Sequence, residues 1–519
     1  MSTVMENTSP QNDKSFFGHP RGLSTLFFTE MWERFSFYGL RALLMLYMTA
    51  EVTKGGLGWD NKKAAPIYAL YAASVYFLPL IGGWIADRFI GAKRATLIGG
   101  IIIMLGHFTL AFSNPTTFYL GLIFVATGTG FLKSNISVMV GDLYTKEDAR
   151  RDAGFSIFYM GINLGATIAP LVCGFLAENP WFKGFISSMG FDPNSSWHFG
   201  FAAAGVGMFF GLVQYLWGRK NLVGAGEVRV DPDAAGKEKT QMSPLYIIEM
   251  IALAVIATTI VVFFVYTRDF DFAMSYVLMP TVLIAGLIGV LLSGMQDKLS
   301  GDDWKRIGVI LVLFVFSTIF WMGFEQAATS LNLFARDMTD LKSLGLEASY
   351  LQAVNGFFIV VLAPVVGAVW YYLGTRQPSD SVKFSIALLF GGLGFIVVAV
   401  AVNLGGGGKV SPLWLFLVYF LHTIGELCLS PVGLSSMTKL APPKMVSLMM
   451  GVWFLSISMG NYIAGMIAGE FKPEVAVVTN IFFTVAMIMV GAAVLLFIIS
   501  PLVKKLYTKP QLVVPIETA

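Results

Sequence analysis

Long blocks of apolar residues recur along this chain of 519 residues, and they limit its possible folds more than any other feature. Each block holds about 20 mostly uncharged residues, the length that an α-helix needs to cross a bilayer. None shows the alternating pattern of a membrane-spanning strand, and lipid accepts only helices or closed barrels. We therefore expect an all-α membrane protein with fourteen spans. The expected spans are 26–49, 65–86, 94–112, 117–140, 154–177, 199–217, 245–265, 275–294, 306–328, 349–373, 383–403, 412–437, 446–468 and 476–502.

The composition agrees with a membrane protein and argues against other classes. Apolar residues make up 56% of the chain and charged residues 13%, about half the charged share of an average globular protein. A net charge of +3 is too small to indicate an acidic partner, and no soluble segment carries a basic stripe for nucleic acid. Cys173 and Cys428 lie inside apolar blocks without metal-binding spacing, so we expect buried core residues and neither a metal nor a cofactor.

Basic residues in the loops indicate how the spans are oriented. Placing both termini in the cytoplasm puts most of the 35 Lys and Arg residues on that side, as the positive-inside rule requires. The first 22 residues lack a charged segment followed by an apolar one. We therefore expect no cleavable signal, with insertion directed by the first span.

A polar stretch over 218–243, rich in charge, Gly and Pro, interrupts the apolar blocks after the sixth span. Two plainer spans follow it, and six more close the chain. The expected division is a six-helix bundle over 1–217, a cytoplasmic linker with two additional helices over 218–305, and a second six-helix bundle over 306–519. Two halves with a site between them at mid-membrane are typical of secondary transporters.

Ionisable residues inside the spans are the strongest indication of function, since each costs at least ~2.5 kcal/mol at a helix centre on insertion scales. The first span holds Glu30, Glu33, Arg34 and Arg41. At about 100° per residue, these four residues share one helix face with Tyr38. Such a face is expected to point into a bundle interior or a watery cavity.

Lys133, Glu325 and Glu426 add charges from three further spans. One interpretation is that all these charges are structural ion pairs between helices. The other is a cavity for a zwitterion, in which Arg41 and Lys133 hold a carboxylate and Glu426 holds an ammonium. A buried Glu that gains and loses an Arg partner also changes its proton affinity, which suits proton coupling. The chain has no P-loop, HExxH or GxSxG motif, so we do not expect an enzyme.

Four sequence motifs lie in these spans. They are Glu30-Met-Trp-Glu33-Arg34-Phe35, Gly128-Thr-Gly-Phe-Leu-Lys133, Phe158-Tyr-Met-Gly-Ile-Asn163-Leu-Gly165 and Gly425-Glu426-Leu-Cys-Leu-Ser430-Pro431. In this order, they resemble the motifs of the proton-dependent oligopeptide transporter family, which belongs to the major facilitator superfamily. The loop from Gly83 to Arg94 also resembles that superfamily's loop between spans two and three.

The resemblance implies the major facilitator fold and proton-coupled symport of di- and tripeptides into the cytoplasm by alternating access. It implies a multi-pass protein of the bacterial inner membrane whose partners are peptides, protons and the bilayer, and a monomer is our default expectation. The implied proton-coupling residues are Glu30, Glu33, Arg34 and Glu325, the last of which would pair with Arg41 when unprotonated. The implied substrate-binding residues are Tyr38, Arg41, Tyr76, Lys133, Asn163, Trp321, Asn355, Glu426, Ser430 and Trp453.

One departure from the family concerns histidine. Animal members carry a histidine in span two that takes part in proton coupling, whereas span two here contains none. Coupling is therefore expected to rest on carboxylates, as in other bacterial members. The four histidines of the chain match no family site, and they are His19, His107, His198 and His422.

Three alternatives stay open. The chain could be a related carrier of nitrate or a peptide-like drug, although nitrate would not need the ammonium site that Glu426 offers. It could be a drug/proton antiporter of the same superfamily. It could also be a membrane enzyme or sensor, although the sequence shows neither a catalytic motif nor a soluble output domain.

Overall fold

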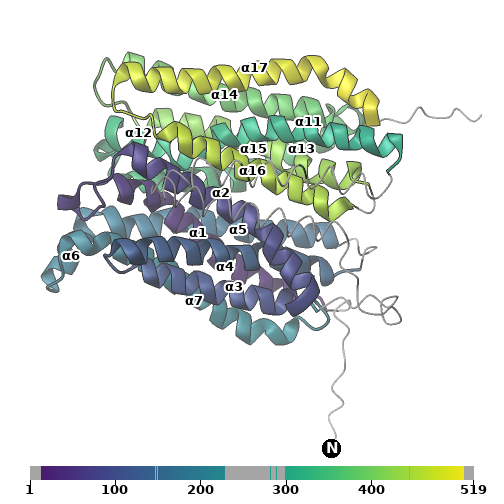
Figure 1. Ribbon diagram of the computed structural model, residues 1–519, viewed down its shortest axis with the longest axis horizontal. Coiled ribbons are helices and arrows are strands. Elements are labelled where there is room, and N and C mark those ends of the chain that lie inside the picture. Colours follow the sequence, from purple (N-terminus) through teal and green to yellow (C-terminus); the bar gives the residue numbers. More distant parts are fainter. Residues whose placement is uncertain are drawn as a thin grey trace, which may run out of the picture.

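Long helices run side by side through the whole molecule (Figure 1). This computed structural model describes residues 13–145, 148, 150–227, 281, 288, 299–442 and 445–507. Eleven helices in these ranges are long and apolar enough to cross a membrane. The first helix, Arg21–Thr49, is not among the eleven because charged residues interrupt its apolar stretch. The predicted spans 245–265 and 275–294, with most of the predicted linker, lie outside the described residues. The all-α prediction is confirmed.

Six long helices pack together in the first half of the chain. Their close contacts depend on small residues, as is usual between helices in lipid. At the crossing of two of them, a Cβ added to Gly99 would lie 2.5 Å from the Gly128 carbonyl oxygen, so only glycine allows this approach. The helices are α1 (Arg21–Thr49), α2 (Asn61–Ile85), α3 (Ala92–Leu110), α4 (Pro115–Asp142), α5 (Arg151–Glu178) and α7 (Ser196–Gly218), with the short α6 (Pro180–Ser188) between the last two.

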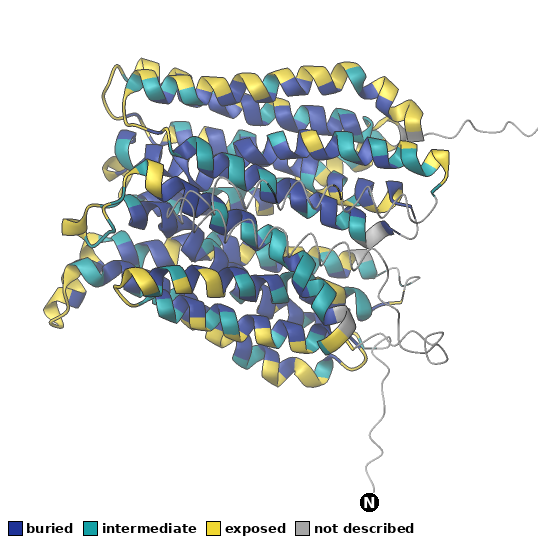
Figure 2. Cartoon of the chain, in the orientation of Figure 1, coloured by how far each residue is buried: buried dark blue, intermediate teal, exposed yellow. Residues whose placement is uncertain are grey.

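The second half of the chain forms a similar group of packed helices (Figure 1). Large apolar side chains cover the outer faces of both groups, and the residues between helices are buried (Figure 2). The helices of this half are α11 (Gly301–Phe324), α12 (Ser330–Met338), α13 (Gln352–Leu373), α14 (Asp380–Leu404), α15 (Leu413–Leu440), α16 (Val446–Ala468) and α17 (Val475–Tyr507).

The predicted span over 306–328 differs from the structure, because α11 ends at Phe324 and the short 3-10 turn η8 (Glu325–Ala328) leads into α12. The side chain of Gln326 stabilises this break. Its Nε2 donates to the carbonyl oxygens of Met322 at 3.2 Å and of Ala464 at 3.4 Å, while its Oε1 accepts from Ser330 Oγ. The amide therefore satisfies polar groups that a broken helix would otherwise leave unpaired.

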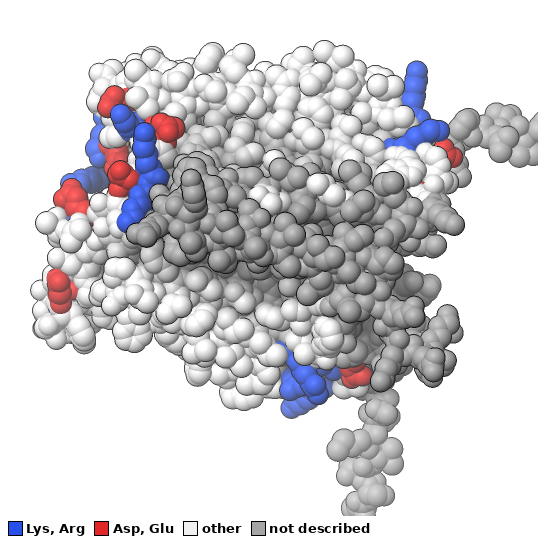
Figure 3. All heavy atoms as spheres, viewed as in Figure 1, with Lys and Arg blue, Asp and Glu red and all other residues white. Residues whose placement is uncertain are grey.

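The two ends of the molecule are distinct. We call the end that holds Thr49, Asn61 and α6 the distal end, and the end that holds Arg21 and Tyr507 the proximal end (Figure 1). On the face shown in Figure 3, charged side chains gather at these two ends, and the described surface between them is uncharged. This distribution fits an apolar belt that lies in hydrocarbon.

Helices α2 and α16 form one contact between the halves, which we call the α2–α16 seam. Ser458 Oγ donates to the Ala73 carbonyl oxygen at 2.8 Å near its middle. A Cβ on Gly465 would lie 2.6 Å from the Ala69 Cβ on the distal side, and one on Gly451 would lie 2.9 Å from Leu80 on the proximal side. The α2–α16 seam is thus closed over most of its length.

Helices α5 and α13 form the second contact between the halves, which we call the α5–α13 seam. It is closed at the distal end, where a Cβ on Gly356, near the start of α13, would lie 2.5 Å from Thr167 Oγ1. Closer to the proximal end, Met160 of α5, on the same helix face as Thr167, is 50% exposed. Val360 of α13, one turn after Gly356, is 48% exposed. The halves therefore part along the proximal portion of this seam.

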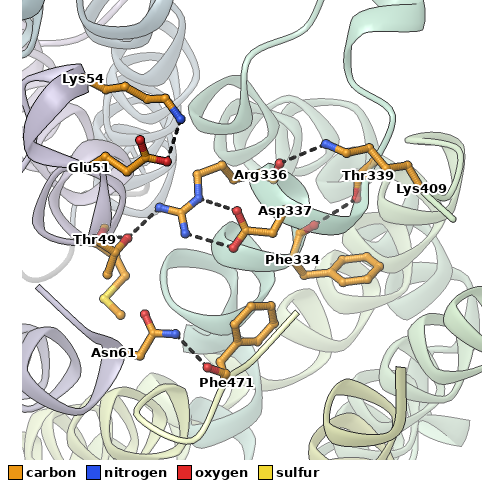
Figure 4. A network of polar contacts seen from close by, with 11 residues as sticks. Thr49, Glu51, Lys54, Asn61, Phe334, Arg336, Asp337, Thr339, Lys409 and Phe471 are labelled. Carbon is orange, nitrogen blue, oxygen red and sulfur yellow. Dashed lines mark hydrogen bonds and ion pairs between the residues drawn. The ribbon is translucent and has the colours of Figure 1, made fainter. Parts of the chain in front are cut away.

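Polar contacts join the halves at the distal end (Figure 4). Arg336, near the end of α12, donates from Nη1 to Thr49 Oγ1 at 2.6 Å and pairs with Asp337 through Nε at 2.7 Å. Asn61 Nδ2 donates to the Phe471 carbonyl oxygen at 2.7 Å. The distal end is consequently closed while the proximal end is partly open.

Candidate functional site

The charged residues of α1 form a buried cluster. Helical spacing of four residues places Glu30 and Arg34 on the same face, and Arg34 Nε lies 3.1 Å from Glu30 Oε1. Arg34 also pairs with Glu33. All three residues are at most 3% exposed. The E-x-x-E-R-F motif thus places two carboxylates around one guanidinium inside the first half.

A buried ion pair connects the halves. Arg41 of α1 lies with Nη2 2.7 Å from Oε2 of Glu325, which begins the η8 break. One residue after Arg41, the Ala42 carbonyl oxygen accepts from Asn332 Nδ2 of α12 at 3.0 Å. The broken helix therefore brings both Glu325 and Asn332 against the same turn of α1.

Aromatic rings accompany the cations of the first half. Lys133 Nζ lies 3.5 Å from the centroid of the Tyr76 ring, and the Arg41 guanidinium lies 5.5 Å from that of Tyr38. A ring face attracts a cation without neutralising it. The rings therefore leave these basic side chains able to pair with an anionic group, as Arg41 does with Glu325.

Glu426 of α15 lies in a polar group contributed by the second half. Asn355 Nδ2, from the first turn of α13, donates to Glu426 Oε2 at 3.0 Å and to Thr423 Oγ1 at 3.0 Å. The sequence analysis missed Thr423, although it precedes Glu426 by three residues and so lies on the same helix face. Glu426 is 9% exposed.

The remaining predicted residues lie in different surroundings. Asn163 Nδ2 donates to the Tyr159 carbonyl oxygen within α5 at 3.0 Å. Trp321 Nε1 and Ser430 Oγ are buried and have no hydrogen-bond partner within the described residues. Trp453 is 2% exposed and packs on α15, where a Cβ on Gly433 would lie 2.1 Å from its ring.

Tyr159 is a second residue that the sequence analysis missed. It lies one turn before Asn163 in the F-Y-x-x-I-N-x-G motif and is 39% exposed. The motif itself was the available signal, because an aromatic residue one turn from a polar side chain shares its helix face.

The charges of this central site are separated by sign between the halves. The first half contributes two basic side chains, Lys133 and the Arg41 that pairs with Glu325, and the second half contributes the carboxylates Glu325 and Glu426. Such a site can bind a molecule with a carboxylate at one end and an ammonium at the other, because charge-assisted hydrogen bonds are the strong ones.

Comparisons with known proteins identify the relatives of this chain. Residues 93–482 match the family model described as the POT family. The uncharacterized transporter YclF of Bacillus subtilis is 41% identical over 95% of this chain and 96% of its own length. The peptide transporter YePEPT of Yersinia enterocolitica is 38% identical over 96% of this chain and 98% of its own length. A di-/tripeptide transporter of Lactococcus lactis is 36% identical over 96% of this chain and 99% of its own length.

Solved structures share the architecture. A crystal structure of the peptide transporter POT in complex with sulfate matches with a TM-score of 0.82 at 40% identity, over 96% of this chain and 98% of that chain. A POT family transporter in complex with 5-aminolevulinic acid matches with a TM-score of 0.81 at 34% identity, over 95% of this chain and 99% of that chain.

Proposed function

This chain belongs to the POT family of membrane transporters and has the major facilitator fold, and from that premise we propose that it carries di- and tripeptides across the membrane together with protons. The relatives named as peptide or di-/tripeptide transporters support the substrate class. The observation that carries the proposal is the ion pair of Arg41 with Glu325, because it links the two halves through a group that a proton can neutralise.

The charged ends of the peptide are the features that the central site recognises. Arg41 and Lys133 bind the terminal carboxylate, and Glu426, with Asn355 and Asn163, binds the terminal ammonium. Both ends of every di- or tripeptide carry these charges, whatever the side chains are. The pockets for the side chains of the peptide are assigned to Tyr38, Tyr76, Trp321, Ser430 and Trp453.

The proton acts on the ion pair between the halves. When Glu325 is ionised it holds the Arg41 guanidinium at 2.7 Å. Protonation removes the charge that holds the pair, and Arg41 becomes free for the peptide carboxylate. Release of peptide and proton restores the pair. The cluster of Glu30, Glu33 and Arg34 next to it provides further exchangeable carboxylates.

The closed distal end and the parted proximal end correspond to a conformation open toward the proximal side. The basic loops favour the cytoplasm for that side and for both termini, in a bacterial inner membrane. We assign the six-helix bundles to 1–217 and 306–519, with the linker and two additional helices over 218–305 between them. We take a monomer as the working unit because one chain contains both halves of the site.

The test is uptake of labelled dialanine by proteoliposomes with an inward proton gradient. We expect uptake that stops when a protonophore collapses the gradient and that other dipeptides compete away. 5-Aminolevulinic acid belongs in the competition series, since it also joins an amine to a carboxylate and lies in the solved relative. Folded, inserted protein that takes up no dipeptide under this gradient would refute the proposal.

A further inference from the structure

A carboxylate outside the central site joins the halves at the distal end of the α5–α13 seam. The backbone N–H of Ser349 donates to Glu178 Oε2 at 3.2 Å. Glu178 is the last residue of α5, and Ser349 lies in the turn η10 (Ala348–Leu351), which leads directly into α13. A side chain of the first half thus caps the start of a helix in the second half.

The surrounding packing holds this cap in place. Ser349 is fully buried, and a Cβ on Gly174 would lie 2.0 Å from its Oγ and 3.1 Å from the Tyr350 ring. Only glycine therefore lets η10 approach α5 this closely. The backbone bond from Ser349 to Glu178 is thus held inside a tightly packed contact between the halves.

The charge of Glu178 strengthens the contact. The first N–H groups of a helix have no partner within it and form the positive end of its dipole. An ionised carboxylate is a much stronger acceptor there than a neutral one. The charged and titratable groups facing Glu178 are Glu347 and Tyr350 from the η10 side and Lys183 from α6. Burial raises the pKa of Glu347, while Lys183 opposes that rise.

Other distal contacts between the halves do not depend on such a group. Asn61 is a neutral donor to a backbone carbonyl oxygen. Arg336 stays charged at any relevant pH, and its carboxylate partner Asp337 belongs to the same half. Glu178 differs because a single proton removes its charge. It also lies at the distal end, where a proton coming from that side arrives before it reaches Glu325.

We propose that Glu178 is a second proton-binding residue of the transport cycle, whose protonation loosens the distal contact between the halves. The proposal rests on the proposed function in one respect, that the cycle opens the distal end. Neutral Glu178 no longer holds the start of α13 by charge, and α13 separates from α5 beginning at Ser349. A proton on Glu178 thereby favours the distal-open state, and a proton on Glu325 frees Arg41.

The experiment measures distal opening directly, without transport. Spin labels at Lys54→Cys and Lys342→Cys report the distance between exposed distal loops of the two halves, by double electron–electron resonance. Cys173 and Cys428 are buried, so the unsubstituted chain serves as the labelling blank. All measurements use the Glu325→Gln background, in which the carboxylate that pairs with Arg41 no longer titrates.

In this background we expect the distal-open population to grow as the pH falls from about 8 to about 5. Adding Glu178→Gln should raise the ratio of open to closed protein roughly tenfold at the higher pH, because a charge-assisted bond is lost. It should also abolish the response to pH. Glu178→Asp, which shortens the side chain and keeps the charge, should retain the response.

Glu347→Gln is the matched control, since Glu347 is a neighbouring carboxylate without a bond to Ser349. It should leave the distance distribution as it is. The proposal is overturned if Glu178→Gln leaves the pH response intact, or if Glu347→Gln changes it equally. Absence of dipeptide uptake would instead refute the proposed function and would leave these distances interpretable.

Discussion

The two seams between the halves are built from the same kind of helix pair, yet one is closed over most of its length and the other is parted at its proximal portion. On α16, the small residues Gly451, Ser458 and Gly465 recur every seven residues and all face α2. Two helical turns separate them, so they form one stripe along the helix. This stripe lets α2 approach from the distal end almost to the proximal end.

Helix α5 has small residues too, but those in its proximal portion face elsewhere. A Cβ on Gly161 would meet Phe27 and one on Gly165 would meet Met31, both in α1 of the same half. Gly174 alone of these three faces the second half. A seam can stay closed only where the small residues of one helix face the helix of the other half. The position of these residues therefore decides which seam can part. The following predictions test that comparison, from the largest effect to the smallest.

The ion pair that lies between the seams gives the largest effect. Arg41→Ala leaves Glu325 buried without its partner, which costs about 3–5 kcal/mol. We expect a large fall in the midpoint of thermal unfolding and loss of proton-driven dipeptide uptake. Adding Glu325→Gln should restore stability without restoring uptake. Undiminished uptake by Arg41→Ala would mean that the halves do not need this contact.

The closed seam should not tolerate a larger residue. Gly465→Leu introduces a side chain where even a Cβ would lie 2.6 Å from Ala69, and such overpacking costs about 1–3 kcal/mol. We expect a lower unfolding midpoint and a shorter lifetime in detergent. An unchanged midpoint would show that the α2–α16 seam gives way easily, and the comparison would fail.

The parted seam provides the matched control. Val360→Leu adds bulk to a side chain on the α5-facing side of α13 that is 48% exposed, so its effect on the free energy of unfolding should stay within about 0.5 kcal/mol. The same thermal assay measures it. A loss as large as that of Gly465→Leu would indicate that the proximal portion of α13 is packed.

A histidine at the proximal end gives the smallest effect. His19 Nδ1 lies 2.9 Å from Tyr144 Oη, and burial, followed by the nearby Arg150, lowers the pKa of His19. The neutral imidazole is favoured in the folded chain, so its contribution is complete above the unfolded pKa of about 6.5 and is lost as the pH falls below it.

Both partners of that contact belong to the first half, so acid should loosen it without moving the halves apart. Hydrogen exchange over 13–20 should accelerate between about pH 7 and about pH 5 by less than tenfold. His19→Gln should remove this acceleration. An acceleration that persists in the variant would assign it to another group.

Much of the fold could be predicted from the sequence because a membrane span is a property of about 20 consecutive residues. The predicted span 154–177 compares with α5 at Arg151–Glu178, and 383–403 with α14 at Asp380–Leu404. The break at η8 could not be predicted, since it depends on Gln326 finding a carbonyl oxygen on α16, far along the chain. The amphipathic helices α6 and α12 are too short to register as spans.

The candidate site divides in the same way. Charged residues such as Arg41 and Glu426 could be recognised because each is costly in a span. Thr423 and Tyr159 were missed because a neutral polar side chain in a span costs little when its hydroxyl bonds locally, as Thr423 Oγ1 does to the Tyr419 carbonyl oxygen. Only their helical spacing from Glu426 and Asn163 marked them. The parting of one seam also depends on which neighbour each glycine faces, and this requires the three-dimensional structure.

The contact of Gly174 with Ser349 has a mechanical consequence for α13. The helix is held against α5 near its distal start, and its 22 residues extend about 33 Å toward the proximal end. It is therefore a lever with its fulcrum at one end, and a rotation of about 10° there displaces the far end by roughly 6 Å. Pro364, inside α13, removes one backbone donor and gives the lever a second point of bending. A small change in the angle between α13 and α5 at the distal end thus changes the distance between the two helices at the proximal end.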